Sequence, residues 1–458
     1  MSNIPAFKVY SNYNWKTLPQ IAFLSKEQQA AIEAVSNVLP FRVNQYVIDQ
    51  LIDWENIPED PMFQLTFPQQ GMLNPEDFER VTRAVSSGLD KQSLAGLVES
   101  IRSKLNPHPS GQMQYNVPYL DSESTVGIQH KYRETVLFFP SRGQTCHSYC
   151  TFCFRWAQFI GDKNLKFAAE NNEELNKYLL SHHEVTDIII TGGDPLVMKT
   201  DHLSRLLEPL LQPDFSHIKN IRIGTKSLSF WPYRFVTDDD ALDLLGLFRK
   251  IVNSGKHLAI MAHYNHWKEL ETSIAEKAIS NVLETGAVIR SQAPLLAHIN
   301  NNADVWSKLW KKQVQMNIIP YYMFVERDTG AKNYFEVPIC NAYEIYSSAM
   351  SKISGLCKTV RGPVMSAEPG KVEILGISEI SGEKVFVLRF IQARDEKWTN
   401  QIFFAKYDSK ATWFNHLKPV NSEKFFFEKE HQLLLQQITQ DGSRGFDKKI
   451  DKRETVEA

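Results

Sequence analysis

Three cysteines of the chain lie within eight positions, as Cys146, Cys150 and Cys153. Their C-x3-C-x2-C spacing allows three thiolates of one loop to bind one inorganic centre, and a four-iron cluster held in this way keeps one iron open to a small molecule. A structural zinc ion usually takes two separated pairs of ligands, and the other two cysteines form no such pair. The alternative zinc site would need His147 as a fourth ligand from the same tight loop. The spacing therefore favours a 4Fe-4S cluster.

The elements that must position this loop are predicted from alternating apolar runs and amphipathic segments. Six apolar runs read as strands: Val136–Phe139, Asp187–Thr191, Ile221–Thr225, His257–His263, Ala287–Leu296 and Ile318–Val325. Amphipathic segments between them, such as Glu173–Leu180 and Ala241–Asn253, predict the helices of parallel βαβ units. We therefore expect an α/β fold with a partial (β/α)6 barrel. Function in such barrels lies at the carboxyl ends of the strands, and the cysteine loop follows the first strand.

Three regions are expected along the chain. Residues 1–125 read as a helical N-terminal region, with caps at Ser25 and at Asn74-Pro75. Residues 126–371 form the barrel core. Residues 372–458 form a small extension that contains β structure, and we expect its charged tail, from Gln440 onward, to be disordered.

The composition excludes several classes of protein. The 458 residues carry a net charge of -2, with 23% charged and 43% hydrophobic residues, which is ordinary for a soluble globular protein. The near-neutral balance argues against a nucleic-acid partner. No apolar run is long enough to span a bilayer, and the N-terminus has no apolar signal region, so we expect no membrane association and a cytoplasmic location.

Further motifs occur in a characteristic order, and together with the cysteine loop they resemble the lysine 2,3-aminomutase family of the radical S-adenosylmethionine (SAM) superfamily. The resemblance spans roughly Leu39 to Lys371. The motifs are Leu39-Pro40-Phe41-Arg42, His130-Lys131-Tyr132, Thr191-Gly192-Gly193-Asp194-Pro195-Leu196, Ile221-Arg222-Ile223-Gly224, His263-Tyr264-Asn265-His266, Pro294-Leu295-Leu296 and Pro320-Tyr321-Tyr322. The resemblance implies a 4Fe-4S cluster on the three cysteines, SAM on the open iron, and pyridoxal phosphate (PLP).

Residues at the ends of the predicted strands are the candidate SAM contacts. Glycines let backbone carbonyls approach a ligand, and a carboxylate can pair with its ammonium group or organise the loop. The competing hypothesis is that Asp194 only caps the next helix and that strand-end histidines are satisfied structural donors. By resemblance, the SAM-binding residues are Gly192, Gly193, Asp194, His263, Asn265 and Gln292.

Lys371 is the candidate attachment point for PLP. Counted from Cys357 without gaps, it matches the lysine that forms a Schiff base with PLP in the family. The alternative is a surface lysine in a Pro-Gly turn. Thr135 stands where the family has an arginine that helps to hold the PLP phosphate, so Lys131 and Arg133 are the candidate substitutes.

Two further matches concern the substrate. Arg155 matches the arginine that binds the substrate carboxylate, with a structural ion pair as its alternative role. Asn301 and Val364 stand where the lysine-specific members have two aspartates that hold the distal ammonium of lysine. Burying that ammonium without a counter-charge would be costly, so we expect an amino acid other than free lysine. The zinc-binding cysteines of clostridial members are absent, and no zinc is expected.

The leading hypothesis is thus a radical SAM enzyme that moves an amino group from C2 to C3 of an amino acid, with PLP as its second cofactor. A radical SAM enzyme without PLP, acting on another metabolite or a peptide, is the main alternative, and a non-catalytic iron–sulfur redox sensor is a remote one. The resemblance also implies an external electron donor such as flavodoxin or ferredoxin and a homo-oligomer built on the N-terminal helices.

Overall fold

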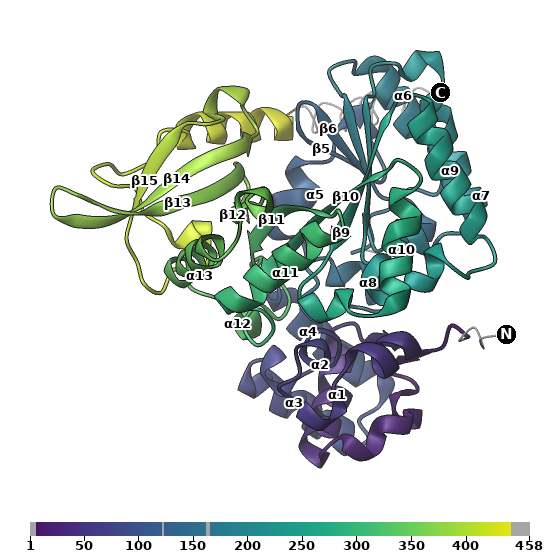
Figure 1. The fold of residues 1–458 in the computed structure, drawn as a ribbon. Helices are drawn as coiled ribbons and strands as arrows, with labels where there is room; N and C mark the ends of the chain where they lie inside the picture. The colour runs from purple at the N-terminus through teal and green to yellow at the C-terminus, as the bar shows by residue number, and fades with distance from the viewer. Residues whose placement is uncertain (1–5, 121–122, 162–164, 441–458) are drawn as a thin grey trace, which may run out of the picture.

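A single sheet of eleven strands forms the centre of the protein. The computed structural model describes residues 6–120, 123–161 and 165–440, and the strand order of this sheet is β15-β14-β13-β12-β11-β10-β9-β8-β7-β6-β5 (Figure 1). Strands β6 to β12 are mutually parallel. They are β6 (Thr135–Phe138), β7 (Asp187–Ile190), β8 (Asn220–Thr225), β9 (His257–His263), β10 (Val288–Leu295), β11 (Ile319–Val325) and β12 (Arg361–Ser366). The predicted α/β barrel is confirmed, with β12 as a seventh parallel strand that the sequence did not predict.

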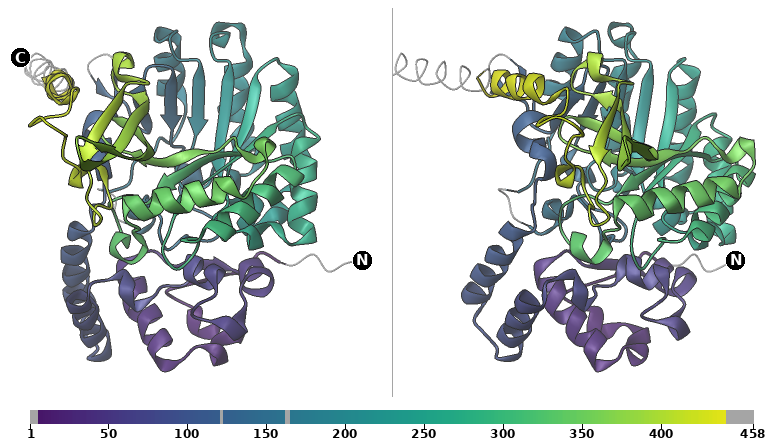
Figure 2. Two further views of the ribbon diagram at one scale, coloured as in Figure 1. Left: turned by 60° about the vertical axis from the view of Figure 1, so that its left-hand side comes forward. Right: turned by 90° about the vertical axis from the view of Figure 1, so that its left-hand side faces the viewer.

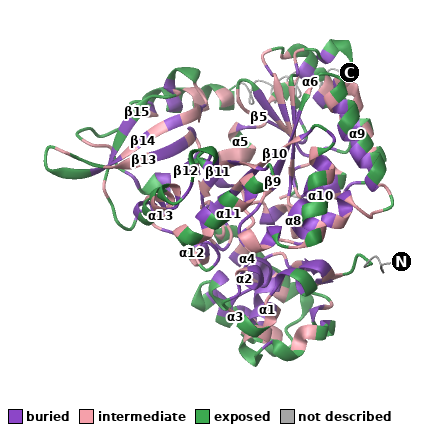
Figure 3. Cartoon of the chain, in the orientation of Figure 1, coloured by how far each residue is buried: buried purple, intermediate pink, exposed green. Residues whose placement is uncertain are grey.

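Helices cover the outer face of the parallel strands, as the βαβ pattern requires. They are α6 (Glu173–Ser181), α7 (Thr200–Leu207), α9 (Ala241–Asn253), α10 (Ser273–Leu283), α11 (Ala303–Gln315) and α13 (Ile339–Ser351). Alternate residues of the strands, such as Ile188 and Ile190 on β7, belong to the buried apolar cluster that these helices complete. Exposed residues lie on the outer sides of the helices (Figure 3). Helix α9 ends before Gly255, whose φ of 84° is the left-handed conformation that ends many helices.

Antiparallel strands extend the sheet at both edges. Strand β5 (Ile128–Tyr132) pairs with β6, and β13 (Gly370–Ile380), β14 (Glu383–Ala393) and β15 (Ile402–Lys406) follow β12. The limit drawn at Lys371 falls inside β13, so the C-terminal extension continues the barrel sheet. The edge strand β5 also contacts the connection between β12 and β13, where Lys131 Nζ donates a 2.5 Å hydrogen bond to Ala367 O. This contact links the two ends of the row of parallel strands, β6 to β12.

The N-terminal helices form a separate layer at one end of the barrel (Figures 1 and 2). They include α1 (Lys26–Val38), α2 (Pro61–Thr66), α3 (Pro75–Ser86) and α4 (Lys91–Lys104). Ser25 makes a capping box with Gln28, and Asn74 caps α3, as the sequence predicts. Short antiparallel strands β1 (Val9–Ser11) and β2 (Arg42–Asn44) accompany these helices. Strands β3 (Tyr119–Leu120) and β4 (Glu123–Ser124) form a second antiparallel pair, and Leu120 packs against the apolar cluster of the barrel.

At the other end of the chain, residues 428–440 are helical. The rest of the tail expected to be disordered lies outside the described residues. No helix among the described residues is long and apolar enough to cross a membrane.

Candidate active site

The cysteine loop lies between the carboxyl end of β6 and the N-terminal layer. Tyr149 N donates to Arg42 O at 2.8 Å, and Thr151 N donates to Leu65 O at 3.0 Å. The hydroxyl of Thr151 also donates to Gln64 O at 2.8 Å. These contacts join the loop to β2 and α2, so the N-terminal layer covers the functional end of the barrel.

Asn44 fixes the first half of the same loop. This side chain is fully buried, and its Nδ2 donates to His147 O at 3.3 Å and to Phe230 O at 2.7 Å. The backbone N–H of Asn44 donates to Ser148 Oγ at 3.0 Å. One residue of β2 therefore links the cysteine loop to the segment after β8. No feature of the sequence alone indicated this role for Asn44.

The three cysteines are free thiols in partly buried positions. Burial raises the pKa of all three, and for Cys146 the negative charges of Asp194 and the other two thiolates raise it further. Thiols in such surroundings ionise readily only when a metal centre binds them. Among the described residues no three His, Cys, Asp or Glu side chains surround one ion position. Each thiolate of a four-iron cluster binds a different iron. The three sulfur atoms therefore need not surround a single metal position, and the loop fits such a cluster.

His147, the candidate fourth ligand in a zinc site, is occupied by other contacts. Its Nδ1 lies 3.0 Å from Ser227 Oγ, and its ring stacks on Trp231 with centroids 6.3 Å apart. Burial lowers the pKa of His147 to about 3, so the imidazole is neutral at physiological pH. This histidine contributes to the packing beneath the loop.

The glycine loop after β7 is in direct backbone contact with the cysteine loop. Asp194 N donates to Thr145 O at 2.7 Å. A Cβ atom on Gly193 would lie 2.4 Å from the same oxygen, which no side chain can tolerate. Gly192 has a φ of 134°, and a Cβ atom there would lie 1.9 Å from Gln144 Nε2. The two glycines therefore allow the two cofactor loops to touch.

The carboxylate of Asp194 joins the loops that follow β7 and β8. It accepts hydrogen bonds from Leu196 N at 3.0 Å, Thr225 Oγ1 at 2.7 Å, Lys226 N at 2.8 Å and Ser227 Oγ at 2.9 Å. Asp194 is 2% exposed. Asp194 thus caps the helical turn that follows it, which is the alternative role considered from the sequence. Because its carboxylate is already engaged, the ammonium group of a ligand in this loop would meet backbone carbonyls.

A buried polar cluster lies at the carboxyl ends of β8, β9 and β10. Gln292 Nε2 is 2.9 Å from His263 Nε2, and Lys226 Nζ donates to Asn265 Oδ1 at 3.0 Å while pairing with Glu269. Burial lowers the pKa of His263 to about 3. The Nδ2 atom of Asn265 is buried and has no partner among the described residues. The cluster offers neutral donors to a polar ligand, and Glu269 balances the charge of its one cation, Lys226.

Two residues of this cluster, Lys226 and Glu269, are not among the SAM contacts predicted from the sequence. Lys226 stands directly after the β8 run, and its place at a strand end was the available signal. Glu269 is fully buried and also accepts from Ser229 Oγ at 2.5 Å and from His266 N at 2.8 Å. No pattern in the sequence marked this glutamate.

Arg155 connects the cysteine loop with the glycine loop. Its Nη1 donates to Thr191 Oγ1 at 2.6 Å and to Gly192 O at 3.0 Å, and its guanidinium lies 4.8 Å from the centroid of the Phe139 ring. Burial lowers the pKa of Arg155 to about 10. The charged groups that act on it are Cys153, Arg327 and Cys146, and no carboxylate pairs with it in the described part of the chain. A charged guanidinium held without a counter-ion can bind an anionic ligand.

Lys371 lies on the second residue of β13, and its amine is turned away from solvent. The Nζ atom donates to Gln392 Oε1 at 2.7 Å and lies 4.9 Å and 5.5 Å from the ring centroids of Tyr322 and Tyr132. Burial, followed by repulsion from Arg222, lowers the pKa of Lys371 from 10.5 to about 7. A large fraction of this amine is therefore neutral and nucleophilic at physiological pH.

Lys131 of β5 lies within charge–charge range of Lys371 and of two arginines, Arg327 after β11 and Arg394 after β14. Burial and the charges of Arg394, Arg327 and Lys371 lower the pKa of Lys131 well below its usual value. Arg394 Nη2 donates to Asn116 Oδ1 at 2.6 Å, and Arg327 Nε is buried without a partner among the described residues. This cationic group of Lys131, Arg327 and Arg394 is suited to a phosphate.

Arg133 does not join that group. Its side chain is 64% exposed and lies 3.7 Å from Glu134 and 3.8 Å from Glu396. Strand β5 ends at Tyr132, so Arg133 belongs to the turn and faces solvent. Thr135, which stands where the arginine was expected, places its hydroxyl 3.4 Å from Asp187 Oδ2.

The two positions that replace the aspartates differ in surroundings. Val364 is fully buried on β12, opposite Glu373 of β13. Asn301 is exposed in the loop before α11. The structure thus keeps one of these positions apolar and leaves the other at the surface.

Comparison with known proteins gives this arrangement its family. No protein-family model matches the chain. It is 31% identical over 392 residues to a putative L-lysine 2,3-aminomutase of Aquifex aeolicus, a match that covers 86% of this chain and 91% of that protein. It is 24% identical to the L-lysine 2,3-aminomutase of Methanococcus maripaludis, over 73% of this chain and 66% of that protein. It is also 24% identical to the glutamate 2,3-aminomutase of Clostridioides difficile, over 76% and 72% of the two chains.

Among solved structures, a radical SAM methyltransferase of Sphaerobacter thermophilus resembles the fold at 12% identity, with a TM-score of 0.34 over 51% of this chain and 68% of that chain. A C-x3-C-x2-C loop at the carboxyl end of a partial (β/α) barrel defines the class of radical SAM enzymes. Within that class, the extent of the match to the Aquifex protein shows that the chain belongs to the lysine 2,3-aminomutase family.

Proposed function

We propose that this protein is an amino acid 2,3-aminomutase that uses a 4Fe-4S cluster, SAM and PLP. The single observation that carries the proposal is the position of Lys371, whose Nζ lies beside the rings of Tyr132 and Tyr322 and within charge–charge range of Lys131, a member of the cationic group. A neutral lysine next to a set of phosphate-binding cations is what PLP requires of a protein. The family membership of the chain supports the same conclusion.

The residues at the functional end of the barrel have separable tasks in this proposal. Cys146, Cys150 and Cys153 would hold the cluster, while the glycine loop and the polar cluster of His263, Asn265 and Gln292 would hold SAM. Bound there, the cluster and SAM supply the radical that removes a hydrogen atom, and PLP carries the migrating amino group. The N-terminal layer covers these loops and limits the access of water to them.

Arg155 and Lys371 would hold the two ends of the reacting part of the substrate. Arg155 donates from Nη1 toward the glycine loop and has an uncompensated charge for the α-carboxylate. Lys371 supplies a neutral amine that can take part in exchange of the amino group and then be protonated at Nζ. Tyr132 and Tyr322 flank that atom and keep its surroundings poor in water.

We further propose that the substrate is an amino acid other than free lysine. Val364 offers no charge, and Asn301 is exposed and neutral, so neither can balance a buried ammonium group. Two relatives are named L-lysine 2,3-aminomutase and glutamate 2,3-aminomutase, so the family includes proteins named for substrates with different side chains.

The test is to incubate anaerobically reconstituted protein with SAM, PLP, a low-potential reductant and single amino acids. The proposal expects 5'-deoxyadenosine and a 3-amino acid from at least one amino acid, with less than about a tenth of that turnover from lysine. Lys371→Ala should yield no 3-amino acid although its cluster content is unchanged. Product formed equally well by Lys371→Ala would contradict the role of PLP.

A further inference from the structure

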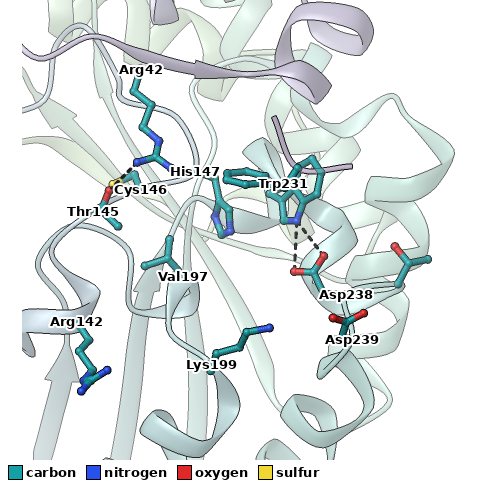
Figure 4. Close-up of a pocket in the computed structure, with 12 residues that line it drawn as sticks. Arg42, Arg142, Thr145, Cys146, His147, Val197, Lys199, Trp231, Asp238 and Asp239 are labelled. Carbon is teal, nitrogen blue, oxygen red and sulfur yellow. Dashed lines mark hydrogen bonds between the residues drawn. The ribbon is translucent and has the colours of Figure 1, made fainter. Parts of the chain in front are cut away.

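A pocket of about 490 Å³ opens between the ends of β5 and β14, beside the residues that surround Lys371. Its wall includes Tyr132, Gln392, Arg394 and Leu434. A pocket of about 450 Å³ beside Cys146 shares no lining residue with the surroundings of Lys371 (Figure 4). Leu434 belongs to the C-terminal helix, residues 428–440, so this helix forms part of the wall next to the proposed PLP site.

The C-terminal helix is fixed to the barrel by a hydrogen bond and by packing. The buried Trp398 donates from Nε1 to Glu430 Oε2 at 2.8 Å. The ring of His431 lies edge-on to that of Trp398, with centroids 5.9 Å apart. Leu434 stands three residues after His431, on the same face of the helix, and packs on the apolar cluster of the C-terminal strands. This face of the helix is therefore turned toward the barrel.

His431 brings an unpaired polar atom to this interface. The residue is 8% exposed, and its Nε2 atom is buried with no hydrogen-bond partner among the described residues. Glu368 Oε1 lies 4.0 Å from Nε2, which is too far for a hydrogen bond. Buried polar atoms in proteins are nearly always paired, so a bound group is the natural partner of this nitrogen.

The charges that act on His431 place it beside the cationic group. Burial, followed by the charges of Arg394 and Lys131, lowers the pKa of His431 to about 4, so the imidazole is neutral at physiological pH. Three cations, Arg394 among them, also repel the amine of Lys131, whereas Glu368 is the carboxylate that opposes them. Such surroundings favour an anion. A neutral imidazole can donate a hydrogen bond to that anion without adding another buried charge.

We propose that His431 binds the phosphate group of PLP, together with the cationic group, by donating a hydrogen bond from Nε2. The inference rests on the proposed function, because it requires PLP at Lys371. It gives the C-terminal helix, which follows the last of the motifs that resemble the family, a part in binding this cofactor. The competing explanation is that His431 only packs against Trp398 and holds the helix in place.

The test compares the binding of PLP with that of pyridoxal, which lacks the phosphate, by absorbance titration of the full-length reconstituted protein. His431→Leu removes the donor, whereas His431→Gln keeps an N–H group near the position of Nε2. The control is Gln432→Leu, a substitution at the exposed neighbouring residue of the same helix. Circular dichroism checks that each variant folds. Hydrogen exchange of residues 428–440 in the wild type, with each ligand, gives a second reading that needs no substitution.

We expect His431→Leu to bind PLP about tenfold more weakly than the wild type, because one hydrogen bond to a charged group is lost. Its affinity for pyridoxal should be unchanged. His431→Gln should recover most of the PLP affinity, and Gln432→Leu should match the wild type. PLP, but not pyridoxal, should slow hydrogen exchange in the helix.

An unchanged PLP affinity of His431→Leu, or an equal loss of affinity for both ligands, would overturn the phosphate contact and leave the packing role. Exchange in the helix that PLP does not slow would overturn it as well, even where His431→Leu fails to fold. A wild type that binds neither PLP nor pyridoxal would instead contradict the proposed function.

Discussion

Lys371 and Gln392 face one another across the β13–β14 pair, and the amine of the lysine donates to the amide oxygen of the glutamine at 2.7 Å. This hydrogen bond holds the buried amine near the rings of Tyr132 on β5 and Tyr322 on β11. The position favours the neutral form of the amine, which is the form that acts as a nucleophile.

The protonation of Lys371 can be measured on the protein without cofactors. Burial lowers its pKa to about 7, so labelling by a limiting amine-reactive reagent should rise through pH 7, as followed by mass spectrometry of the Lys371 peptide. Between about pH 7 and 10.5 the unfolded chain keeps a proton that the folded chain has lost, so this lysine makes stability rise with pH in that window. The exposed Lys311 serves as the internal reference. A midpoint near 10.5 for Lys371 would contradict its buried setting.

Replacing Gly193 by alanine should disrupt both cofactor loops. The new Cβ would lie 2.4 Å from Thr145 O, so the backbone of one loop must shift, at a cost of about 1–3 kcal/mol of unfolding free energy. The variant should also bind less iron on reconstitution. Gly246→Ala is the matched control, because that glycine is exposed within α9 and nothing lies near its Cβ position. It should be as stable as the wild type or more so. Equal effects of the two substitutions in chemical denaturation would rule out the close approach of the loops.

The cationic group predicts which residues hold a phosphate. Lys131→Met should weaken PLP binding by about ten- to a hundredfold, because a hydrogen bond to a charged group contributes about 1.5–3 kcal/mol. Arg133→Met should leave binding unchanged, since Arg133 pairs with two glutamates at the surface. Absorbance titrations with PLP measure both affinities, and circular dichroism checks that each variant folds. A larger loss of PLP affinity in Arg133→Met than in Lys131→Met would indicate that Arg133, and not Lys131, binds the phosphate.

Asn44→Ala tests whether the N-terminal layer holds the cysteine loop. The substitution removes hydrogen bonds to His147 O and Phe230 O and leaves buried groups unpaired, so we expect a loss of about 2 kcal/mol of unfolding free energy. Iron content after reconstitution should fall in parallel. Asn37→Ala, which removes a hydrogen bond within α1 alone, should change stability by less than about 0.5 kcal/mol. An Asn44→Ala protein that is as stable as the wild type and binds a full cluster would show that the N-terminal layer does not hold the cysteine loop in place.

Local sequence patterns predicted the barrel well but missed what long-range packing creates. The six predicted strands are apolar runs bounded by polar residues, a pattern that depends only on burial within the sheet. Strand β12 was missed because Gly362-Pro363 interrupts its run, and such a pair usually marks a turn. The hairpin of β13 and β14 was anticipated as a β-like stretch, but its continuity with the barrel sheet was not visible locally.

The site shows the same division. The cysteine spacing identified the cluster loop because three ligands share one short segment. Arg327 and Arg394 could not be paired with Lys131 from the sequence, since only the closure of β5 against β12 and β14 brings them together. The sequence suggests Arg133 because it stands close to Lys131 in the chain, yet β5 ends at Tyr132 and the side chain of Arg133 is turned to solvent.

The central claim is that Lys371 binds PLP covalently, and borohydride trapping tests it most directly. Anaerobically purified, reconstituted protein is incubated with PLP, reduced with borohydride and analysed by peptide mass spectrometry beside Lys371→Ala. We predict a phosphopyridoxyl group on Lys371 of the wild type, absent from the variant. If no adduct forms on Lys371 while SAM is still cleaved to 5'-deoxyadenosine, the aminomutase account is contradicted, and a radical enzyme without PLP takes its place.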